Sequence, residues 1–227
     1  MKKITLELLS ELEKFDSATI QNAGVLVKGF TKSNSDYTNP DLSRMVKKNS
    51  CVVGLAITST WTPISSDVIH TSNKYNFYDT IDDETLPTIA VLKDVDSQIK
   101  RGAIIGDGMA YMMKSLGAVG AIVDGNARDI EGVKKANLDL WATGRVPGHG
   151  PFEMIEYNIT LNVCDLLIKP GDILVCDDDG VTNVDPLLVK DTIKACYEVR
   201  EKESKMHKYF QQKNFSKKTW EKWKLNN

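Results

Sequence analysis

The stretch from Gly106 to Asp129 constrains the fold more than any other, because four local signals follow one another in it without a gap. Gly106-Asp107-Gly108 predicts a tight turn that opens a helix. Apolar side chains then recur at the spacing of one buried helical face, at Met109, Met112, Met113 and Leu116. Gly117 stands where a helix commonly ends. The apolar run 118–123 predicts a buried strand, and Asp124-Gly125-Asn126 predicts a turn after it.

This succession predicts a site where the start of the helix faces the end of the strand. A helix N-terminus offers free backbone N–H groups and a partial positive charge, which suit a carboxylate or a phosphate. Neighbouring strand residues point to opposite faces, so Arg128 and Asp129 share a pocket only if the predicted turn takes the chain out of β geometry. Arg128 can then grip a carboxylate, and Asp129 can bind a hard divalent cation. A plain turn followed by a surface Arg-Asp pair is the alternative.

Apolar spacing and capping residues predict two helices at the start of the chain. The first covers about residues 3–14, and the second begins at Asp16 or Ser17 and ends at Gly24. Residues 29–49 are polar and rich in turn formers, which favours a loop with a short helix.

Two β-branched and apolar runs, 51–60 and 86–92, predict strands on either side of a polar, aromatic segment. This segment, residues 61–86, predicts a long excursion that carries short elements of its own. We interpret its histidine, His70, as an ordinary polar side chain.

The second half of the chain predicts a β-rich meander. Strands are expected at 138–143, 157–163, 166–168, 173–176 and 181–184, with turns at Pro170-Gly171 and Asp179-Gly180. The Gly- and Pro-rich loop 143–151 contains His149 and is interpreted as a surface loop, although it can also lie over the site.

The C-terminal part predicts a helix over about 187–213 and a basic tail with interleaved aromatic residues. The tail aromatics are Tyr209, Phe210, Phe215, Trp220 and Trp223. Such interleaving can indicate nucleic-acid binding. We favour an amphipathic helix whose aromatics pack on the body or on a neighbouring subunit while its lysines face water.

A chain of 227 residues can bury a sizeable core, and the near balance of charge, −2, does not indicate nucleic acid as a general partner. Four cysteines are scattered without a CxxC pair, which favours reduced thiols. No apolar run is long enough to span a membrane, and glutamates interrupt any signal-peptide core near the start. The sequence therefore predicts a cytoplasmic protein without membrane contact.

Four blocks of the sequence stand out together: Asp107 with Arg128-Asp129, the run 169–181, and the shorter runs 15–23 and 52–58. In this order they resemble the RraA-like family, which includes the class II 4-hydroxy-4-methyl-2-oxoglutarate/4-carboxy-4-hydroxy-2-oxoadipate aldolases. Asp107 followed after twenty residues by Arg128-Asp129 matches the family's active-site motif. The run 169–181 is similar to its PGD…DxDGV signature. Weaker matches are 15–23, where Asn22 replaces a usual Asp, and 52–58.

The resemblance implies an α/β fold, a three-layer ββα sandwich of the swivelling-domain type with flanking N- and C-terminal helices. Residues 1–190 would form the catalytic domain, and 191–227 a basic and aromatic helical extension. It also implies a homotrimer, or a hexamer built as a dimer of trimers, with the active site in a cleft between subunits. Relatives receive a Glu from the neighbouring C-terminal part; Glu198, Glu201 and Glu203 are the possible counterparts.

The chemistry implied by the resemblance is cleavage of a C–C bond in a 4-hydroxy-2-oxo acid to release pyruvate. Gly106, Asp107, Gly108 and Met109 would line the carboxylate and keto end of the substrate, and Arg128 would stabilise the enolate. Asp129 would anchor Mg²⁺ or Mn²⁺, which acts as a Lewis acid. Asp107 would hold a metal-bound water that returns a proton to carbon. Decarboxylation of oxaloacetate is expected as a side activity.

Two alternatives come from other classes of protein. The family's founding member regulates an RNA-degrading endonuclease by protein–protein contact, so a non-catalytic regulator is the main alternative. A dinucleotide enzyme is the second, but the third glycine of its turn should fall at position 111, which is Tyr111.

Overall fold

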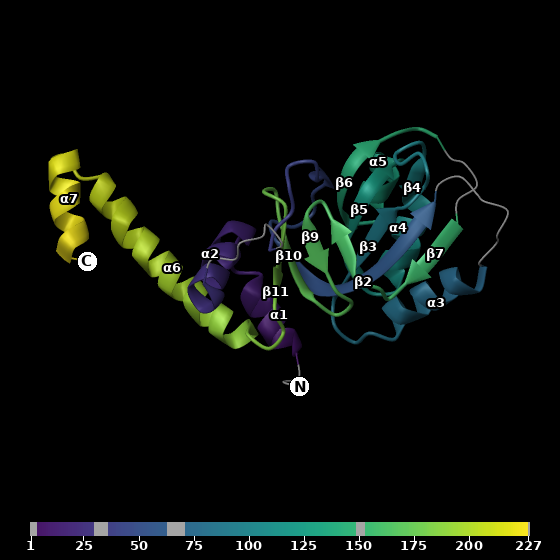
Figure 1. The fold of residues 1–227 in the computed structure, drawn as a ribbon, viewed down its shortest axis with the longest axis horizontal. Coiled ribbons are helices and arrows are strands. Elements are labelled where there is room, and N and C mark those ends of the chain that lie inside the picture. The colour runs from purple at the N-terminus through teal and green to yellow at the C-terminus, as the bar shows by residue number, and fades with distance from the viewer. Residues whose placement is uncertain (1–3, 30–35, 63–70, 149–152, 227) are drawn as a thin grey trace.

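The computed structural model describes residues 4–29, 36–62, 71–148 and 153–226. They form a mixed α/β fold in which helices from both ends of the chain flank a curled sheet (Figure 1). The helices are α1 (Leu6–Leu12), α2 (Ser17–Lys28), α3 (Thr71–Asp82), α4 (Asp107–Ser115), α5 (Ile130–Lys135), α6 (Val189–Phe210) and α7 (Lys217–Asn226). Within these ranges, no helix combines the length and the apolar character needed to cross a membrane.

The main sheet has nine strands in the order β1-β6-β5-β3-β2-β10-β11, with β4 paired to β5 and β7 paired to β2. Its strands are β1 (Ser43–Val46), β2 (Val52–Thr62), β3 (Thr88–Asp94), β4 (Ala103–Ile105), β5 (Ala118–Ala127), β6 (Asp139–Arg145), β7 (Glu153–Tyr157), β10 (Ile173–Cys176) and β11 (Val181–Val184). A separate hairpin joins β8 (Leu161–Val163) and β9 (Leu166–Ile168). The central strands β2, β3, β5 and β6 run parallel, and β4 runs parallel to β5.

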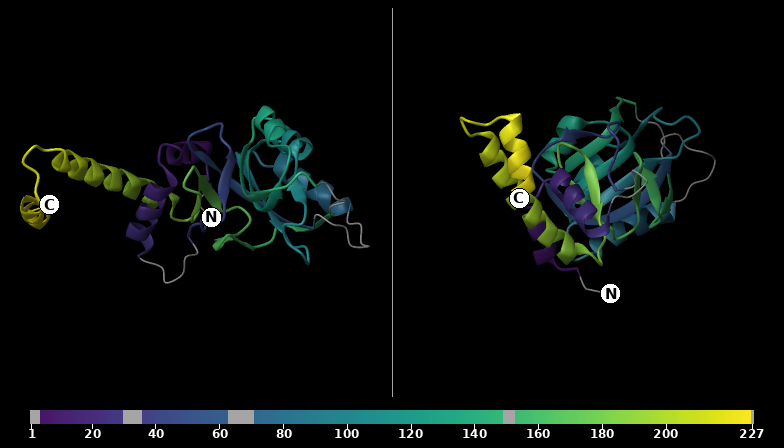
Figure 2. Two further views of the ribbon diagram at one scale, coloured as in Figure 1. Left: turned by 90° about the horizontal axis from the view of Figure 1, so that it is seen from above. Right: turned by 60° about the vertical axis from the view of Figure 1, so that its left-hand side comes forward.

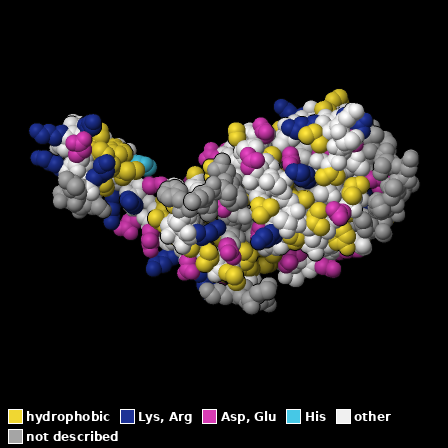
Figure 3. All heavy atoms as spheres, viewed as in Figure 1, with side chains coloured by type: hydrophobic (Ala, Val, Ile, Leu, Met, Phe, Trp, Pro, Cys, Tyr) yellow, Lys and Arg dark blue, Asp and Glu magenta, His cyan; other side chains and the backbone are white. Residues whose placement is uncertain are grey.

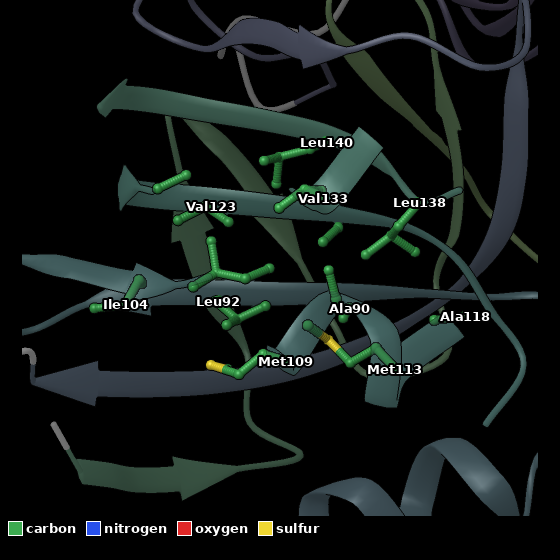
Figure 4. Close-up of a cluster of buried hydrophobic side chains, with 14 of the residues drawn as sticks. Ala90, Leu92, Ile104, Met109, Met113, Ala118, Val123, Val133, Leu138 and Leu140 are labelled. Carbon is green, nitrogen blue, oxygen red and sulfur yellow. The ribbon is translucent and has the colours of Figure 1, made fainter. Parts of the chain in front are cut away.

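Successive side chains of the central strands point alternately into two cores, one on each face of the sheet. This arrangement gives the three ββα layers that the sequence predicts. On one face, Ala90 and Leu92 of β3 pack with side chains of α4 and α5 (Figure 4). On the other face, Ile89 and Val91 pack against the β8–β9 hairpin. A third core joins α1, α2 and α6 to β10 and β11 at the end of the sheet.

Two expectations about the first half of the chain were wrong, and the expected excursion over 61–86 carries an element of its own, as predicted. Helix α2 continues through Gly24 to Lys28 and ends at Gly29, whose φ of 81° suits glycine. The described part of 29–49 contains the strand β1 in place of a short helix, and β1 pairs with β6 at the sheet edge. The segment 61–86 continues β2 to Thr62 and then forms α3, which buries Phe77 and Ile81 completely. His70 lies outside the described residues.

The central stretch also differs from its prediction in two places. Strand β5 does not turn at 124–126 but runs on to Ala127, because that segment is held between β4 and β6. In α4 the buried face is Met109, Ala110 and Met113, whereas Met112 is 43% exposed. Gly117 follows the helix with a φ of 106°, as its position predicts.

Candidate functional site

The site is built where β4 and β5 end side by side. The two strands are parallel and Ile105 pairs with Ala127, so Gly106 and Arg128 both leave the sheet at the same edge. The backbone N–H of Arg128 donates to the Ile105 carbonyl over 3.0 Å, which holds the two exits together. The convergence expected from a turn within 124–126 is therefore produced by strand pairing.

Gly106 is the N-cap of α4 and provides no capping side chain. Its φ of −137° and ψ of −173° are extended values that any residue adopts, so its backbone does not require glycine. The space around it does: a Cβ at this position would lie 2.9 Å from Asp129 Oδ2 and 3.2 Å from Arg128 Nε. Glycine thus lets the start of the helix touch the Arg-Asp pair directly.

Arg128 and Asp129 form an ion pair, with Nε and Oδ2 separated by 3.2 Å. Their side chains are 28% and 40% exposed, so both reach solvent at the site. In the part of the chain that the structure describes, no residue accepts a hydrogen bond from the two terminal nitrogens of Arg128. The planar end of the guanidinium is therefore available for a second, bidentate partner.

Asp129 adopts a left-handed conformation, with φ 53° and ψ 40°, and is the N-cap of α5. Its carbonyl accepts the Val133 N–H at 2.9 Å, which begins the helix. Aspartate tolerates this region better than most residues, although it costs of order 1–3 kcal/mol. This conformation turns the carboxylate back toward Gly106. In a regular strand the carboxylate would have pointed away from Arg128.

A small cavity of about 200 Å³ lies at this junction and is lined by residues 103–109 and Arg128. The structure thus brings together all five residues predicted to bind substrate: Gly106, Asp107, Gly108, Met109 and Arg128. Asp129 does not line the cavity; its Oδ2 lies beside Gly106 and is paired with Arg128, which does. A cavity of this size suits the carboxylate and keto end of a small acid rather than a large ligand.

The carboxylate of Asp107 folds back onto its own helix, where Oδ1 accepts the Gly108 N–H at 2.7 Å. A second glycine, Gly132 of α5, makes room for it: a Cβ there would lie 2.6 Å from Asp107 Oδ2. Close packing of α4 on α5 therefore sets the position of this carboxylate.

A polar network in the loop before β4, which sequence reasoning did not find, ties this loop to β2 and β5. Asp96 is buried and accepts hydrogen bonds from Thr62 Oγ1 at 2.7 Å and from Arg101 at 2.8 Å. Burial acts to raise the pKa of Asp96, but hydrogen bonds from Gln98, Thr62 and Arg101 outweigh it and hold the pKa below its usual value. Asn126 of β5 donates to the Lys100 carbonyl at 2.6 Å and ties the loop before β4 to the sheet.

The second sequence block, 169–181, lies away from this cavity and has a structural role. Asp177 is buried and accepts from the backbone N–H and the hydroxyl of Ser17, at 2.6 and 2.7 Å. It thereby joins the β10–β11 turn to the start of α2. Gly180 has a φ of 132°, and a Cβ there would meet Thr38 Oγ1 at 2.8 Å.

Other candidates from the sequence do not join the cavity. Glu198 and Glu201 lie on α6 and pair with Lys194 and Lys205 of the same helix. Figure 1 shows α6 leading away from α4 and β4, so neither these glutamates nor Glu203 reaches the site of its own chain. His149 lies outside the described residues.

The donor set around the cavity suits a hard cation better than a soft one. Among the described residues, no three His, Cys, Asp or Glu side chains cluster as a ligand cage, which is what a structural zinc site requires. Mg²⁺ commonly uses one or two carboxylates and keeps several waters. Asp129, with an exposed carboxylate beside the cavity, fits that requirement.

A family model described as RraA-like, Aldolase/RraA, matches residues 18–182. The chain belongs to this family. Its relatives include an uncharacterised Methanocaldococcus jannaschii protein, 29% identical over 51% of this chain and 57% of that protein. A Halalkalibacterium halodurans protein named "Putative 4-hydroxy-4-methyl-2-oxoglutarate aldolase" is 34% identical over 44% of this chain and 47% of that protein. The chain thus spans about half the length of these curated relatives.

Solved structures share the fold of this RraA-like chain. RraAS2 of Streptomyces coelicolor, titled an unusual member of the RNase ES inhibitor RraA protein family, superposes with a TM-score of 0.73. It is 22% identical and covers 91% of this chain and 98% of its own. An uncharacterised Pseudomonas syringae protein gives a TM-score of 0.74 at 23% identity, over 94% of this chain and 92% of that one. At these identities the likeness establishes the fold, which confirms the predicted architecture.

Proposed function

We propose that the protein is a divalent-metal-dependent lyase that cleaves a C–C bond of a 4-hydroxy-2-oxo acid and releases pyruvate. One observation carries the proposal: Arg128 and Asp129 meet Gly106 at a small cavity lined by the start of α4. Membership of a family whose description includes aldolases supports it.

The substrate carboxylate would lie between the start of α4 and the guanidinium of Arg128. The free N–H groups and the dipole of a helix start favour an anion. The two open terminal nitrogens of Arg128 can bind two oxygens at once. As the bond breaks, negative charge moves onto the former keto oxygen, and Arg128 stabilises that enolate more strongly than the neutral ketone.

Asp129 would hold Mg²⁺ or Mn²⁺ at the edge of the cavity, next to Arg128. When bound, such an ion acts as a Lewis acid that polarises the keto group of the substrate. The contact between Asp129 and Arg128 keeps the carboxylate beside Gly106. Asp107 would orient a water molecule that takes the proton of the substrate's 4-hydroxyl group as the C–C bond breaks and returns a proton to the enolate carbon.

The same enolate forms when oxaloacetate loses CO₂, so oxaloacetate decarboxylation is proposed as a second activity of the site. The test is a pyruvate-release assay over a panel of 4-hydroxy-2-oxo acids together with oxaloacetate. Turnover of at least one compound, lost in Arg128→Lys, is expected. No pyruvate from any compound in the presence of Mg²⁺ or Mn²⁺ would refute the lyase.

A non-catalytic regulator of an RNA-degrading endonuclease is the second candidate. It is favoured by the likeness to RraAS2, whose title places that protein in an RNase ES inhibitor family. A pull-down that retains an endonuclease, together with an inactive lyase assay, would support this candidate instead. For either function we propose a homotrimer or a hexamer as the assembled form, measured by light scattering.

A further inference from the structure

The C-terminal end of the chain projects from the body as an arm, defined here as residues 200–226. Helix α6 leaves the body beside α2, and α7 folds back on its tip, beyond the sheet in every view (Figures 1 and 2). The arm aromatics pack on one another: the Trp220 and Trp223 rings stack at 5.0 Å, and Phe210 meets Trp220 at 4.8 Å. The predicted packing of these rings on the chain's own body is therefore wrong.

The arm keeps an exposed apolar surface. Phe210 and Phe215 are 37% and 42% exposed, and a groove between α6 and α7 is lined by Met206, Trp220 and Trp223 among charged residues. Figure 3 shows hydrophobic and basic side chains gathered on this tip. An exposed aromatic surface that is surrounded by charged residues is typical of a protein interface.

Charge separates sharply between the arm and the body. The arm holds nine Lys and Arg against three Asp and Glu, a net charge of +6. Because the whole chain carries −2, the rest of it carries −8. Lys213, Lys217 and Lys218 are exposed and form no ion pair with any described residue. A basic arm is therefore attached to an acidic body.

The counterpart lies on α3, at the opposite end of the long axis (Figure 1). One face of α3 buries Phe77, Tyr78 and Ile81. The other presents Tyr75, 65% exposed, with Asp79, Asp82 and Asp83 at helical spacings from it. Within the described chain these three carboxylates have no ion-pair partner.

We propose that the arm of one subunit docks on the exposed face of α3 in a second copy of the chain. The aromatic and basic tip meets an aromatic and acidic helix face, so apolar contact and charge both favour the pairing. The two surfaces lie at opposite ends of the molecule, so an arm cannot reach its own α3. A contact between unlike surfaces is head-to-tail, and it closes into a ring where the rotation permits. The inference rests on the oligomer proposed above.

The test exchanges the charges of the two surfaces and measures mass by analytical ultracentrifugation. Lys217→Glu/Lys218→Glu and Asp82→Lys/Asp83→Lys should each weaken self-association at least about tenfold, because like charges then face each other. An equimolar mixture of the two variants should form mixed pairs, since the arm of one then matches the helix of the other. A closed trimer of the two variants keeps one like-charged contact, so the mixture should associate more strongly than either variant alone but less strongly than the wild type. Lys134→Glu/Lys135→Glu, two adjacent exposed lysines of α5, is the matched control and should associate like the wild type.

Circular dichroism accompanies each variant, and Lys217→Gln/Lys218→Gln provides a milder change with an intermediate loss of association. The proposed contact is overturned if either charge-reversal variant keeps the wild-type mass, or if the two variants do not associate when mixed. A wild-type monomer overturns the contact and the oligomer together. If reversing the charge of the arm lowers binding of a labelled single-stranded oligonucleotide but leaves the mass unchanged, the arm binds nucleic acid instead. Pyruvate release is measured separately, so failure of the lyase and failure of the contact are distinguishable.

Discussion

Gly106→Ala is expected to reduce lyase activity strongly while the fold stays intact. The added Cβ would lie 2.9 Å from Asp129 Oδ2 and 3.2 Å from Arg128 Nε, whereas ordinary contacts begin at 3.4 Å. The carboxylate must therefore move by about 0.5 Å and the guanidinium by somewhat less. Both atoms belong to the ends of flexible side chains, so the backbone need not shift.

The effect on stability is expected to be small, because two contributions oppose each other. Alanine caps a helix less well than glycine and costs of order 0.5–1 kcal/mol. Replacing glycine also lowers the entropy of the unfolded chain, which contributes about 0.4–1 kcal/mol in the other direction. The melting temperature should stay within about 4 °C of the wild type.

The effect on catalysis should be larger, since a displacement of about 1 Å in a positioning group can lower the rate a hundredfold. For about half that displacement we expect kcat/KM to fall at least about tenfold, which corresponds to about 1.4 kcal/mol. Steady-state pyruvate release beside a melting curve provides the assay. Gly24→Ala is the control, because its Cβ would meet nothing within 4 Å and it lies in α2. Wild-type kinetics in Gly106→Ala would refute the placement of the site.

Arg128→Lys should lower kcat/KM at least about tenfold with an unchanged melting curve, because an ammonium lacks the planar fork; a collapsed melting temperature would instead make Arg128 structural. Asp129→Asn should fold normally, since Asn also tolerates a left-handed backbone, and isothermal titration should show weaker Mn²⁺ binding than in the wild type. Gly132→Ala should lower both turnover and the melting temperature, because its Cβ would lie 2.5 Å from Asp107 Cβ and 2.6 Å from Asp107 Oδ2, so that Asp107 is displaced and α4 and α5 must move apart; unchanged turnover would remove Asp107 from the mechanism. Asp139→Ala should lower the free energy of unfolding by about 3 kcal/mol in urea, because Arg44, the Lys48 N–H and the Asn49 amide all lose a buried acceptor while Arg44 keeps Asp178 at 2.9 Å; a wild-type midpoint would contradict that.

The sequence predicted the parts of the site that depend on local signals. Glycines at 106 and 108 begin α4, Gly117 follows its end, and Arg128 and Asp129 reach the same cavity edge as Gly106. The start and the end of α4 depend on residues within one turn of each other, where local preferences decide the backbone. Arg128 and Asp129 meet Gly106 because β4 pairs with β5, so the convergence was predicted but for a different reason.

Pairing between distant segments could not be predicted in the same way. Asp124-Gly125-Asn126 has the composition of a turn, yet it continues β5 because neighbouring strands bind it on both sides. Glycine is needed at position 125 because of close packing with another strand: a Cβ there would lie 3.0 Å from Asp94 Cβ. Strand β4, only three residues long, has too little pattern to be recognised alone, although it delivers Gly106 to the site.

Helix α3 and the packing of the arm were difficult to predict from the sequence for a related reason. The apolar face of α3 has three members, Phe77, Tyr78 and Ile81, within a polar segment, so its periodicity is weak. In the arm, spacing alone predicts an amphipathic surface but does not say what covers it. Its aromatics turned out to pack on each other in a helical hairpin.

The most direct test of the central claim is pyruvate release by the purified protein before and after chelation. With 4-hydroxy-4-methyl-2-oxoglutarate or oxaloacetate as substrate, EDTA should abolish release, and excess Mg²⁺ or Mn²⁺ should restore it in the wild type but not in Asp129→Asn. Full activity in the chelated protein, or equal restoration in Asp129→Asn, would contradict the metal-dependent lyase.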